Sequence, residues 1–451
     1  MRVSELVLPE VRDALKGDPS AIRELVEELH PADSAEIFLS LTEEEQPQFL
    51  KSLPVPDQVQ ILEELEDEQR AETFEKIAPD MATRLAVEMS PDERADLFRA
   101  LPPALAAKLL ARLPKEDARD LRSLLAWPEG TAGSLMTTDF VDLVAEMTVA
   151  QAIERIREVA EEVETIYYAY AVSPEGSLRG VVSLRSLVTA KPETALTDLM
   201  DSEHLITVKG DTDQEEVAQI ISKYDLLAVP VVDDAGRILG IVTVDDIVDV
   251  VEAETTEDVQ KLSGMAPLED TYFRASFFRM VRSRAGWLIV LFLGELLTGT
   301  ALRAYEDSFV DALALVFFIP LIVSAGGNTG GQSAGLLIRA LALGEVVPKQ
   351  FGRVALREAA SGLLLGIILA SIGALRALLW PDIDPRIAIV VGLAVLFVVS
   401  FAALVGALMP ILIKSVGLDP AVSSAPLIAT FVDVIGMVIY FQIAKAVLTP
   451  G

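Results

Sequence analysis

The chain has 451 residues and a formal net charge of −31, with no cysteine and only two histidines, His30 and His204. Disulfides and thiolate metal sites are therefore excluded, and a zinc or iron site built on imidazole is disfavoured. Any bound metal is expected to have oxygen ligands, as Mg²⁺ and Ca²⁺ prefer.

The charge is distributed unevenly along the chain. Residues 271–451 carry 13 Lys and Arg against 10 Asp and Glu, which leaves 24 basic and 58 acidic residues in 1–270. So acidic a surface argues against nucleic-acid binding, which needs clustered basic residues, and indicates either cation binding or simply solubility. The N-terminus lacks the apolar core of a signal peptide, so the acidic part is expected to stay in the cytoplasm.

The first part of the chain repeats every 24 residues. The segments "LTEEEQPQFLKSLP", "LEDEQRAETFEKIAP", "MSPDERADLFRALP" and "LPKEDARDLRSLLAW" begin at Leu41, Leu65, Met89 and Leu113. Each has an acidic start suited to a helix N-terminus, an apolar stripe and a stop near proline. Two short helices per period predict a helical superhelix over residues 1–128.

A second duplication follows the turn-rich segment "WPEGTAGS". "VSPEGSLRGVVSLRSLV" at Val172 is repeated as "VDDAGRILGIVTVDDIV" at Val232. Each copy is predicted to run strand, helix, strand, glycine turn, strand, helix. Both copies resemble cystathionine-β-synthase (CBS) domains, which normally act as a regulatory pair, and are placed at residues 131–195 and 196–250.

The remainder is predicted to contain a connecting helix and a membrane domain. An acidic amphipathic helix is expected over residues 248–266, and a transmembrane domain over 270–451. Five apolar runs are each long enough to cross a bilayer, near 286–303, 311–342, 360–380, 387–413 and 420–447. Basic residues before the first span and after the second place the N-terminus inside, and five spans then place the C-terminus outside. The first outer loop, "RAYEDSFVDA", is mostly acidic.

The second span contains the glycine-rich segment "GGNTGGQS". Glycines at this density either let helices pack closely or let the helix open, and the polar residues among them favour the opened helix. The residues predicted to shape a pore here are Gly326, Gly327, Asn328, Thr329, Gly330 and Gln332. No lysine follows the glycines, so a phosphate-binding P-loop is disfavoured.

The fifth span carries a lone acid, Asp433, in the stretch "PLIATFVDVIGMVIYF". A carboxylate inside a membrane costs a few kcal/mol or more, so it normally faces a cavity, an ion or a partner. Pro426, Ala429 and Thr430 precede Asp433, and the latter two share its helical face. Glu295 is a second acid, in the first span, and is interpreted as a protonated or hydrogen-bonded packing residue.

These features together resemble the MgtE family of magnesium channels and transporters. "GGNTGGQS", "GLDPAVSSAPLIATFVDVIG" and the order of the four parts carry the resemblance over nearly the whole chain. It implies a multidomain membrane protein with an α-helical N domain, tandem α/β CBS domains, a plug helix and five transmembrane helices. It also implies a homodimer in a bacterial inner membrane that transports Mg²⁺ and is not an enzyme.

The family's functional residues are carried over onto matching positions of this chain. The pore acid that holds hydrated Mg²⁺ falls on Asp433, with the carbonyl of Ala429 beside it. The regulatory metal positions match Asp92, Asp96, Asp213, Glu215, Asp225, Asp246, Asp249, Glu254, Glu257, Asp258 and Asp419. Bound Mg²⁺ would cancel the repulsion between these carboxylates and keep the pore closed. Taken singly, each of these acids is better interpreted as part of a solvated surface, whereas the matched set favours a Mg²⁺ sensor.

The resemblance also implies ATP as a modulator, bound between the CBS copies through Tyr168, Tyr170 and Arg185. The Thr-x-x-Asp pattern of ribose-binding CBS copies is intact at Thr243 and Asp246, but Ser186 replaces the acid in the first copy. The alternatives are a CBS-regulated transporter of another divalent cation such as Co²⁺, a carrier of a different solute such as an anion, and an intramembrane aspartyl protease. A protease needs two acids that share a proton, and an anion carrier is disfavoured by a lone acid.

Overall fold

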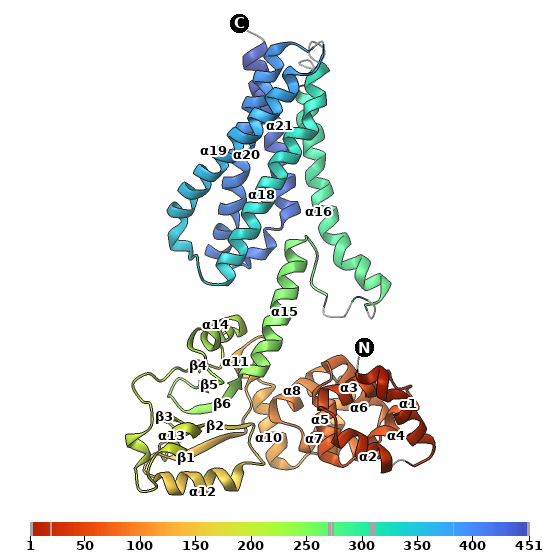
Figure 1. The fold of residues 1–451 in the computed structure, drawn as a ribbon, viewed down its shortest axis with the longest axis vertical. Coiled ribbons are helices and arrows are strands. Elements are labelled where there is room, and N and C mark those ends of the chain that lie inside the picture. Colours follow the sequence, from red (N-terminus) through yellow and green to blue (C-terminus); the bar gives the residue numbers. More distant parts are fainter. Residues whose placement is uncertain are drawn as a thin grey trace. The chain divides into compact units, whose positions relative to one another are not determined.

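The computed structural model describes residues 3–18, 20–268, 272, 275–305, 313–381 and 383–448. The chain divides into two compact units, Met1–Val251 and Glu252–Gly451, which are described separately (Figure 1). Most of the first outer loop, and residues 311 and 312 at the expected start of the second span, lie outside the described residues.

The N-terminal part of the first unit is a stack of short helices. They are α1 (Val3–Lys16), α2 (Ser20–Glu27), α3 (Pro31–Ser40), α4 (Gln46–Lys51), α5 (Val55–Glu63), α6 (Asp67–Lys76), α7 (Pro79–Glu88), α8 (Pro91–Ala100), α9 (Pro103–Leu110) and α10 (Lys115–Leu124). Alternate helices pack on one another, α5 on α7 and α6 on α8, around buried side chains such as Phe49 and Phe74. Two helices per 24-residue period are confirmed, because each period buries its apolar stripe against the next.

The CBS part contains two three-stranded sheets of the same topology. The first copy comprises β1 (Phe140–Val144), α12 (Val149–Val159), β2 (Thr165–Val172), β3 (Leu178–Ser183) and α13 (Leu184–Thr189), after the short α11 (Ala132–Leu135). The second comprises β4 (Val208–Lys209), α14 (Gln214–Tyr224), β5 (Ala228–Val232), β6 (Ile238–Thr243) and α15 (Val244–Leu262), after η1 (Leu196–Asp198). In each sheet the central strand pairs parallel to the first and antiparallel to the third.

The glycine turns of the two copies pair with each other. Gly176 and Gly236 have φ of 81° and 74°, a backbone conformation that side chains rarely adopt. The amide of Leu178 donates to the carbonyl of Gly236 (3.0 Å), and the amide of Ile238 donates to that of Gly176 (3.3 Å). The duplication visible in the sequence therefore becomes a pseudo-symmetric pair.

The connecting helix is not a separate element. The segment expected over 248–266 is instead the second part of α15, which begins at Val244 inside the CBS pattern and ends at Leu262. No glycine or proline interrupts the chain between these residues, so the helix continues.

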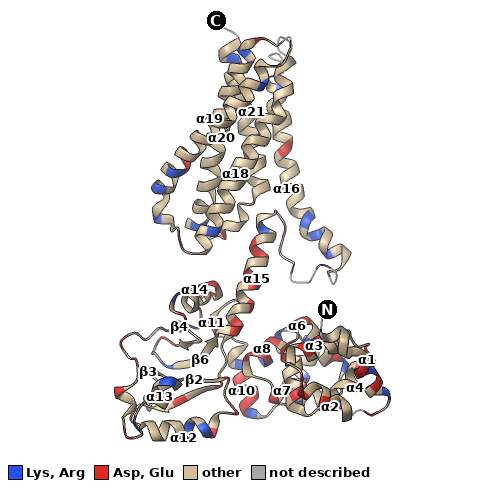
Figure 2. Ribbon diagram, viewed as in Figure 1, with Lys and Arg blue, Asp and Glu red and all other residues tan. Residues whose placement is uncertain are grey.

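The second unit contains five long apolar helices among its described residues, each long enough to cross a membrane. Its elements are α16 (Phe277–Ala304), η2 (Leu313–Phe318), α18 (Ile319–Ala342), η3 (Pro348–Gln350), α19 (Phe351–Leu378), α20 (Pro385–Ser415), η4 (Pro420–Val422) and α21 (Ala425–Leu448). α20 packs against α18, α19 and α21 and forms the centre of the bundle. Figure 2 shows these helices mostly uncoloured along their lengths, with charged segments toward their ends. α19 begins before the expected residue 360 and includes Arg353 and Arg357.

The glycine-rich segment of the second span does not open. α18 is helical through all of its glycines. A Cβ on Gly406 of α20 would lie 2.1 Å from the carbonyl oxygen of Gly330, and a Cβ on Gly326 would lie 2.7 Å from Val398 and from Val432. The expected opening is therefore wrong. The glycines let three helices approach closely while the backbone of α18 keeps its internal hydrogen bonds, as a bilayer requires.

Candidate ion path and regulatory sites

The intramembrane acid Asp433 opens into a cavity between α18 and α21. The cavity measures about 380 Å³ and is lined by Val323, Ser324, Gly327, Asn328, Gly331, Ala425, Pro426, Ala429 and Asp433. Gly327 leaves space in the α18 wall of the cavity because it has no side chain. A Cβ at this position would lie 3.3 Å from the Cβ of Ala429. Oδ1 of Asp433 is buried and has no hydrogen-bond partner among the described residues. A buried carboxylate oxygen without a donor is costly, so this site fits a cation or ordered water.

Not every residue predicted for the pore lines this cavity. Thr329 is buried, and its hydroxyl donates to the carbonyl of Ala325 (2.8 Å). Gln332 is exposed and does not line the cavity, and Thr430 contacts α16 rather than the cavity. Ser324 was not predicted; its hydroxyl accepts from the side-chain amide (Nδ2) of Asn328 (3.3 Å). It lies one turn before Asn328, which is the signal that could have identified it.

Glu295, interpreted as a packing residue, is not packed within the single chain. Its side chain is exposed on α16, and no hydrogen bond or ion pair involving it is found within the described part of the chain. A helix that packs through glycine and threonine at this level leaves the neighbouring long side chain outside the contact.

In the first unit, Asp92, Asp96 and Asp246 are drawn from α8 and α15 into one acidic cluster. Asp92 is only 7% exposed, and its Oδ1 has no hydrogen-bond partner among the described residues. Burial, followed by the charge of Asp92, raises the pKa of Asp246 to about 8. Burial and Asp67 raise the pKa of Asp96 to about 6, although Arg99 lies 2.5 Å from its carboxylate.

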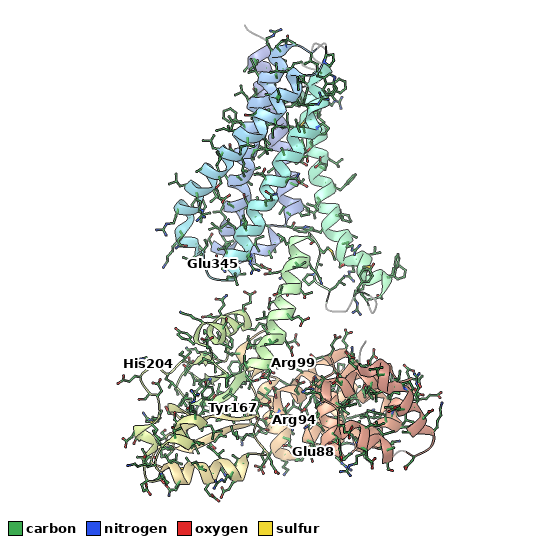
Figure 3. All side chains as sticks on the ribbon, viewed as in Figure 1. Glu88, Arg94, Arg99, Tyr167, His204 and Glu345 are labelled. Carbon is green, nitrogen blue, oxygen red and sulfur yellow. The ribbon has the colours of Figure 1, made fainter. Side chains whose placement is uncertain are left out.

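Four further acids that sequence reasoning missed belong to this cluster. Burial raises the pKa of Glu164 to about 7 and that of Asp139 to about 6, with Asp92 adding to both. Burial also raises the pKa values of Glu63 and Glu93. The pKa of Glu93 reaches about 9 although this residue forms an ion pair with buried Arg70. They come from α5, α8 and the two loops flanking β1 and β2, so no spacing in the sequence indicates them. Figure 3 shows Arg94 and Arg99 where the helical repeats meet the CBS pair.

This cluster is not a complete coordination sphere. Among residues 3–18, 20–268 and the other described segments, no three acidic or histidine side chains are grouped closely enough to hold a metal alone. Mg²⁺ retains most of its water and binds through one or two carboxylates. The unpartnered oxygen of Asp92 and the raised pKa values of its neighbours fit a hydrated divalent cation better than a fully protein-ligated one.

The predicted site at Asp213, Glu215 and Asp225 is not assembled as one group. Asp213 is the N-cap of α14 and accepts from the amide of Glu215 (2.9 Å). Asp225 is at the C-cap, with φ of 52°. The helix between them has 11 residues and a length of about 16 Å, so one ion cannot contact both ends. Any ion held by Asp225 has its other ligands elsewhere.

In the second unit, a lysine occupies the position expected of a metal. Asp419, matched to a regulatory metal position, contacts the end of α15 through the ammonium of Lys261 (2.6 Å), which also pairs with Glu257 one turn earlier. These partners raise the pKa of Lys261 in spite of its partial burial. Burial and Asp419 raise the pKa of Asp258. Lys261 therefore neutralises part of the charge between α15 and the loop before α21.

We expect Lys261→Met to make closure of the pore more dependent on Mg²⁺. Without the ammonium, Glu257 and Asp419 repel each other, and flux at low Mg²⁺ should rise about fivefold, the effect of about 1 kcal/mol for a partly exposed ion pair. Saturating Mg²⁺ should restore closure. Mg²⁺ flux into vesicles at two cytoplasmic Mg²⁺ concentrations measures both effects, with Lys209→Met, in an exposed pair with Asp234, as the control. Equal flux in both variants would contradict this expectation.

We expect the stability of the Met1–Val251 unit to fall between pH 5 and pH 8 when Mg²⁺ is absent. Acids whose pKa is raised on folding bind more protons folded than unfolded, so their stabilisation is complete below their ordinary values of 3.8 and 4.5. It is lost as pH rises through about 6, 7 and 8, the values for Asp96, Glu164 and Asp246.

Mg²⁺ should reverse this loss at pH 8 and have little effect at pH 5, where protons already neutralise the cluster. At a hundred times its Kd, a bound ion raises the Tm of a unit of this size by about 5–10 °C. Thermal denaturation followed by circular dichroism at the two pH values tests this. A Tm that responds equally to Mg²⁺ at both would show that the ion binds elsewhere.

The CBS pair contains a second cavity, of about 230 Å³. Its polar lining is Tyr168, Tyr170, Ser183, Ser186, Asp201 and His204. The hydroxyl of Tyr170 is buried without a hydrogen-bond partner among the described residues, which indicates room for a polar ligand. Arg185, predicted to bind nucleotide, is exposed and does not line the cavity. Ser183 and Ser186 hydrogen-bond to each other (2.7 Å), as Thr243 does to Asp246 (2.5 Å) in the second copy.

Helical repeats, a CBS pair and five apolar helices, two of which enclose a cavity with one acid, are the features of a CBS-containing membrane transporter. Family profiles match the MgtE divalent cation transporter over residues 319–443, the MgtE intracellular N domain over 29–130 and the CBS domain over 132–193 and 196–253. The chain belongs to the MgtE family.

Known relatives agree with this assignment. The magnesium transporter MgtE of Thermus thermophilus is 41% identical over 329 residues, 73% of this chain and 72% of the relative, and that of Enterococcus faecalis is 38% identical over the same shares. The crystal structure of the soluble part of a magnesium transporter matches 56% of this chain and 99% of its own, with 36% identity and a TM-score of 0.53. The cytosolic domain of the Mg²⁺ channel MgtE in complex with ATP matches 54% of this chain and 99% of its own, with 37% identity and a TM-score of 0.52.

Proposed function

We propose that this protein is a homodimeric Mg²⁺ channel that lets Mg²⁺ enter the cell down its electrochemical gradient and is closed by cytoplasmic Mg²⁺. Asp433 carries the proposal, because its carboxylate faces a cavity and one of its oxygens has no hydrogen-bond partner among the described residues. The magnesium transporters among the relatives support the choice of ion.

The cavity suits a hydrated ion. Gly327, Gly331, Ala425 and Ala429 keep its walls small, so water can remain between the ion and the protein. Asn328 and the carbonyl of Ala429 supply polar groups to that water. Mg²⁺ loses water reluctantly, and a carboxylate that contacts it through water still provides the charge it needs. A second copy of the chain related by two-fold symmetry would supply a second Asp433.

Regulation is assigned to the carboxylates outside the membrane helices. Asp92, Asp96, Asp246 and Asp249 are proposed to hold Mg²⁺ between the helical repeats and the second CBS copy. On α15, Glu254, Glu257 and Asp258 are proposed to hold Mg²⁺ together with Asp419. In the second CBS copy, Asp213, Glu215 and Asp225 are each proposed to supply a ligand to a different ion. Bound Mg²⁺ converts repulsion between these acids into attraction and stabilises the closed state. The raised pKa values of Asp92 and Asp246 support this, because they show that uncompensated charge is unfavourable there.

ATP is proposed as a modulator, bound in the CBS cavity against Tyr168 and Tyr170. The cavity, the unpartnered hydroxyl of Tyr170 and the ATP complex of the similar cytosolic domain support it. With Ser186 in place of an acid, ribose binding depends on a neutral hydroxyl and is expected to be weak.

The orientation follows from the distribution of basic residues. We propose that the acidic unit lies in the cytoplasm of a bacterium and the C-terminus outside; Arg279, Arg282 and Arg284 at the start of α16, and Arg339 at the end of α18, support this orientation.

Single-channel recording of the purified protein in a planar bilayer tests the proposal. Unitary Mg²⁺ currents are expected at low Mg²⁺ on the side of the acidic unit, and their open probability should fall as Mg²⁺ on that side is raised. Mg²⁺ transport without unitary currents would show a carrier, and currents unaffected by Mg²⁺ would refute the regulation.

A further inference from the structure

The first membrane helix carries an acid that nothing in the described structure neutralises. Glu295 lies on α16 between the flanking charges Arg284 and Arg303, more than about 10 Å along the helix from either. Its side chain is exposed on the single chain, and the described residues offer it no hydrogen bond or ion pair. A carboxylate at this depth costs a few kcal/mol or more if it faces lipid, so water, an ion or protein must cover it.

A second polar group lies one turn further along the same helix. Thr298 is only 9% exposed, and its hydroxyl is buried without a hydrogen-bond partner among the described residues. A threonine in a membrane helix usually donates to the carbonyl four residues earlier, as Thr329 does on α18. The free hydroxyl of Thr298 is therefore available to a water molecule or to the hydration shell of an ion.

The packing of α16 on α21 places Glu295 and Thr298 beside the helix that carries Asp433. The helices cross at Gly294, where a Cβ would lie 2.8 Å from the Cγ2 of Thr430. Thr430 is one turn before Asp433, and Glu295 follows Gly294 directly, so the two acids flank one crossing.

We propose that Glu295 is a second acid of the ion path and determines its preference for divalent over monovalent cations. This inference rests on the proposed function of Asp433 as the acid that binds the transported ion. Two carboxylates close together are unfavourable when both are charged, and a divalent cation relieves that repulsion more than a monovalent cation does. The hydrated ion contacts Asp433, while Glu295 and the hydroxyl of Thr298 act on it through water.

The position of Glu295 also fits a two-fold dimer. α16 is the least buried of the five membrane helices in the single chain. A second copy packed against α16 would remove Glu295 from lipid, and its own Glu295 and Asp433 would add two more carboxylates to the proposed path. The dimer would then have four acids near the crossing of α16 and α21, two from each chain, where the sequence predicted only Asp433 from each chain.

The test uses the full-length protein in vesicles, with variants Glu295→Gln, Glu295→Asp and Asp433→Asn. Glu295→Gln is expected to raise the Mg²⁺ concentration for half-maximal flux about tenfold and to lower the permeability ratio of Mg²⁺ to K⁺ by a similar factor. Glu295→Asp should keep the Mg²⁺ concentration for half-maximal flux and the permeability ratio close to those of the unmodified protein. Glu345→Gln, an exposed acid after α18, is the control and should behave as the unmodified protein. Size-exclusion chromatography checks that each variant is folded.

The outcomes separate this inference from the one on which it rests. If Asp433→Asn abolishes flux while Glu295→Gln leaves half-saturation and the permeability ratio unchanged, Glu295 has no part in the path. If Asp433→Asn transports Mg²⁺ normally, the proposed function fails first. A Glu295→Gln protein that loses flux but keeps its half-saturation and permeability ratio would show a structural role and would also overturn the inference.

Discussion

Replacing Asp433 with alanine is expected to reduce Mg²⁺ flux in reconstituted vesicles to about a hundredth or less, corresponding to roughly 3 kcal/mol of lost ion stabilisation. The carboxylate is the only acid among the residues that line the cavity between α18 and α21 in the described structure. Without it, an ion that enters the cavity meets Asn328 and backbone carbonyls, which cannot offset the loss of bulk hydration for a divalent cation.

Two further variants distinguish charge from shape at this position. Asp433→Asn keeps the shape and removes the charge, so it should resemble Asp433→Ala; Asp433→Glu keeps the charge and should retain measurable flux. Alanine removes an unpartnered buried oxygen and leaves no new one, so the membrane unit should remain folded. Undiminished Mg²⁺ flux in the alanine variant would exclude Asp433 from the pore.

Neutralising the buried acidic cluster is expected to remove most of the regulation by Mg²⁺. In the double variant Asp92→Asn, Asp246→Asn, two ligands are lost, so the open channel should need about tenfold more cytoplasmic Mg²⁺ to close. Repulsion is lost as well, so flux at low Mg²⁺ should fall. The difference in flux between low and high cytoplasmic Mg²⁺ should therefore become smaller, because flux falls at low Mg²⁺ and closure is weaker at high Mg²⁺.

Flux at several cytoplasmic Mg²⁺ concentrations measures this range. A matched control, Glu28→Gln with Glu72→Gln, removes two exposed acids of the helical repeats and should leave the response unchanged. An unaltered response in the Asp92 and Asp246 variant would place the sensor outside this cluster. A lowered response in both would show that net charge, rather than a defined site, controls closure.

Much of the fold could be predicted because it depends on patterns that repeat between residues close in the sequence. The 24-residue repeat, the alternating strands of the CBS copies and the long apolar runs each involve residues close in sequence. The lone acid Asp433 was equally evident, since a charge in an apolar helix stands out in any window. Predictions that depended on what one element places against another were less successful. The opened helix at Gly326 was wrong for this reason, and Glu295 is not packed within the single chain. Asp213 and Asp225 lie at opposite ends of the same helix, α14, so they do not form one group.

The sequence by itself determined the order and type of the parts, the apolar spans and the position of the intramembrane acid. Hydrophobic period and charge depend only on residues along one element. Only the tertiary structure decided which acids share the cluster, that Lys261 lies between Glu257 and Asp419, and that Glu295 and Thr298 lie at the crossing beside Asp433. Apart from neighbours such as Glu257 and Lys261, which lie one turn apart on α15, those contacts join residues far apart in the sequence. At Gly294 the close approach of α16 to Thr430 depends on the missing side chain.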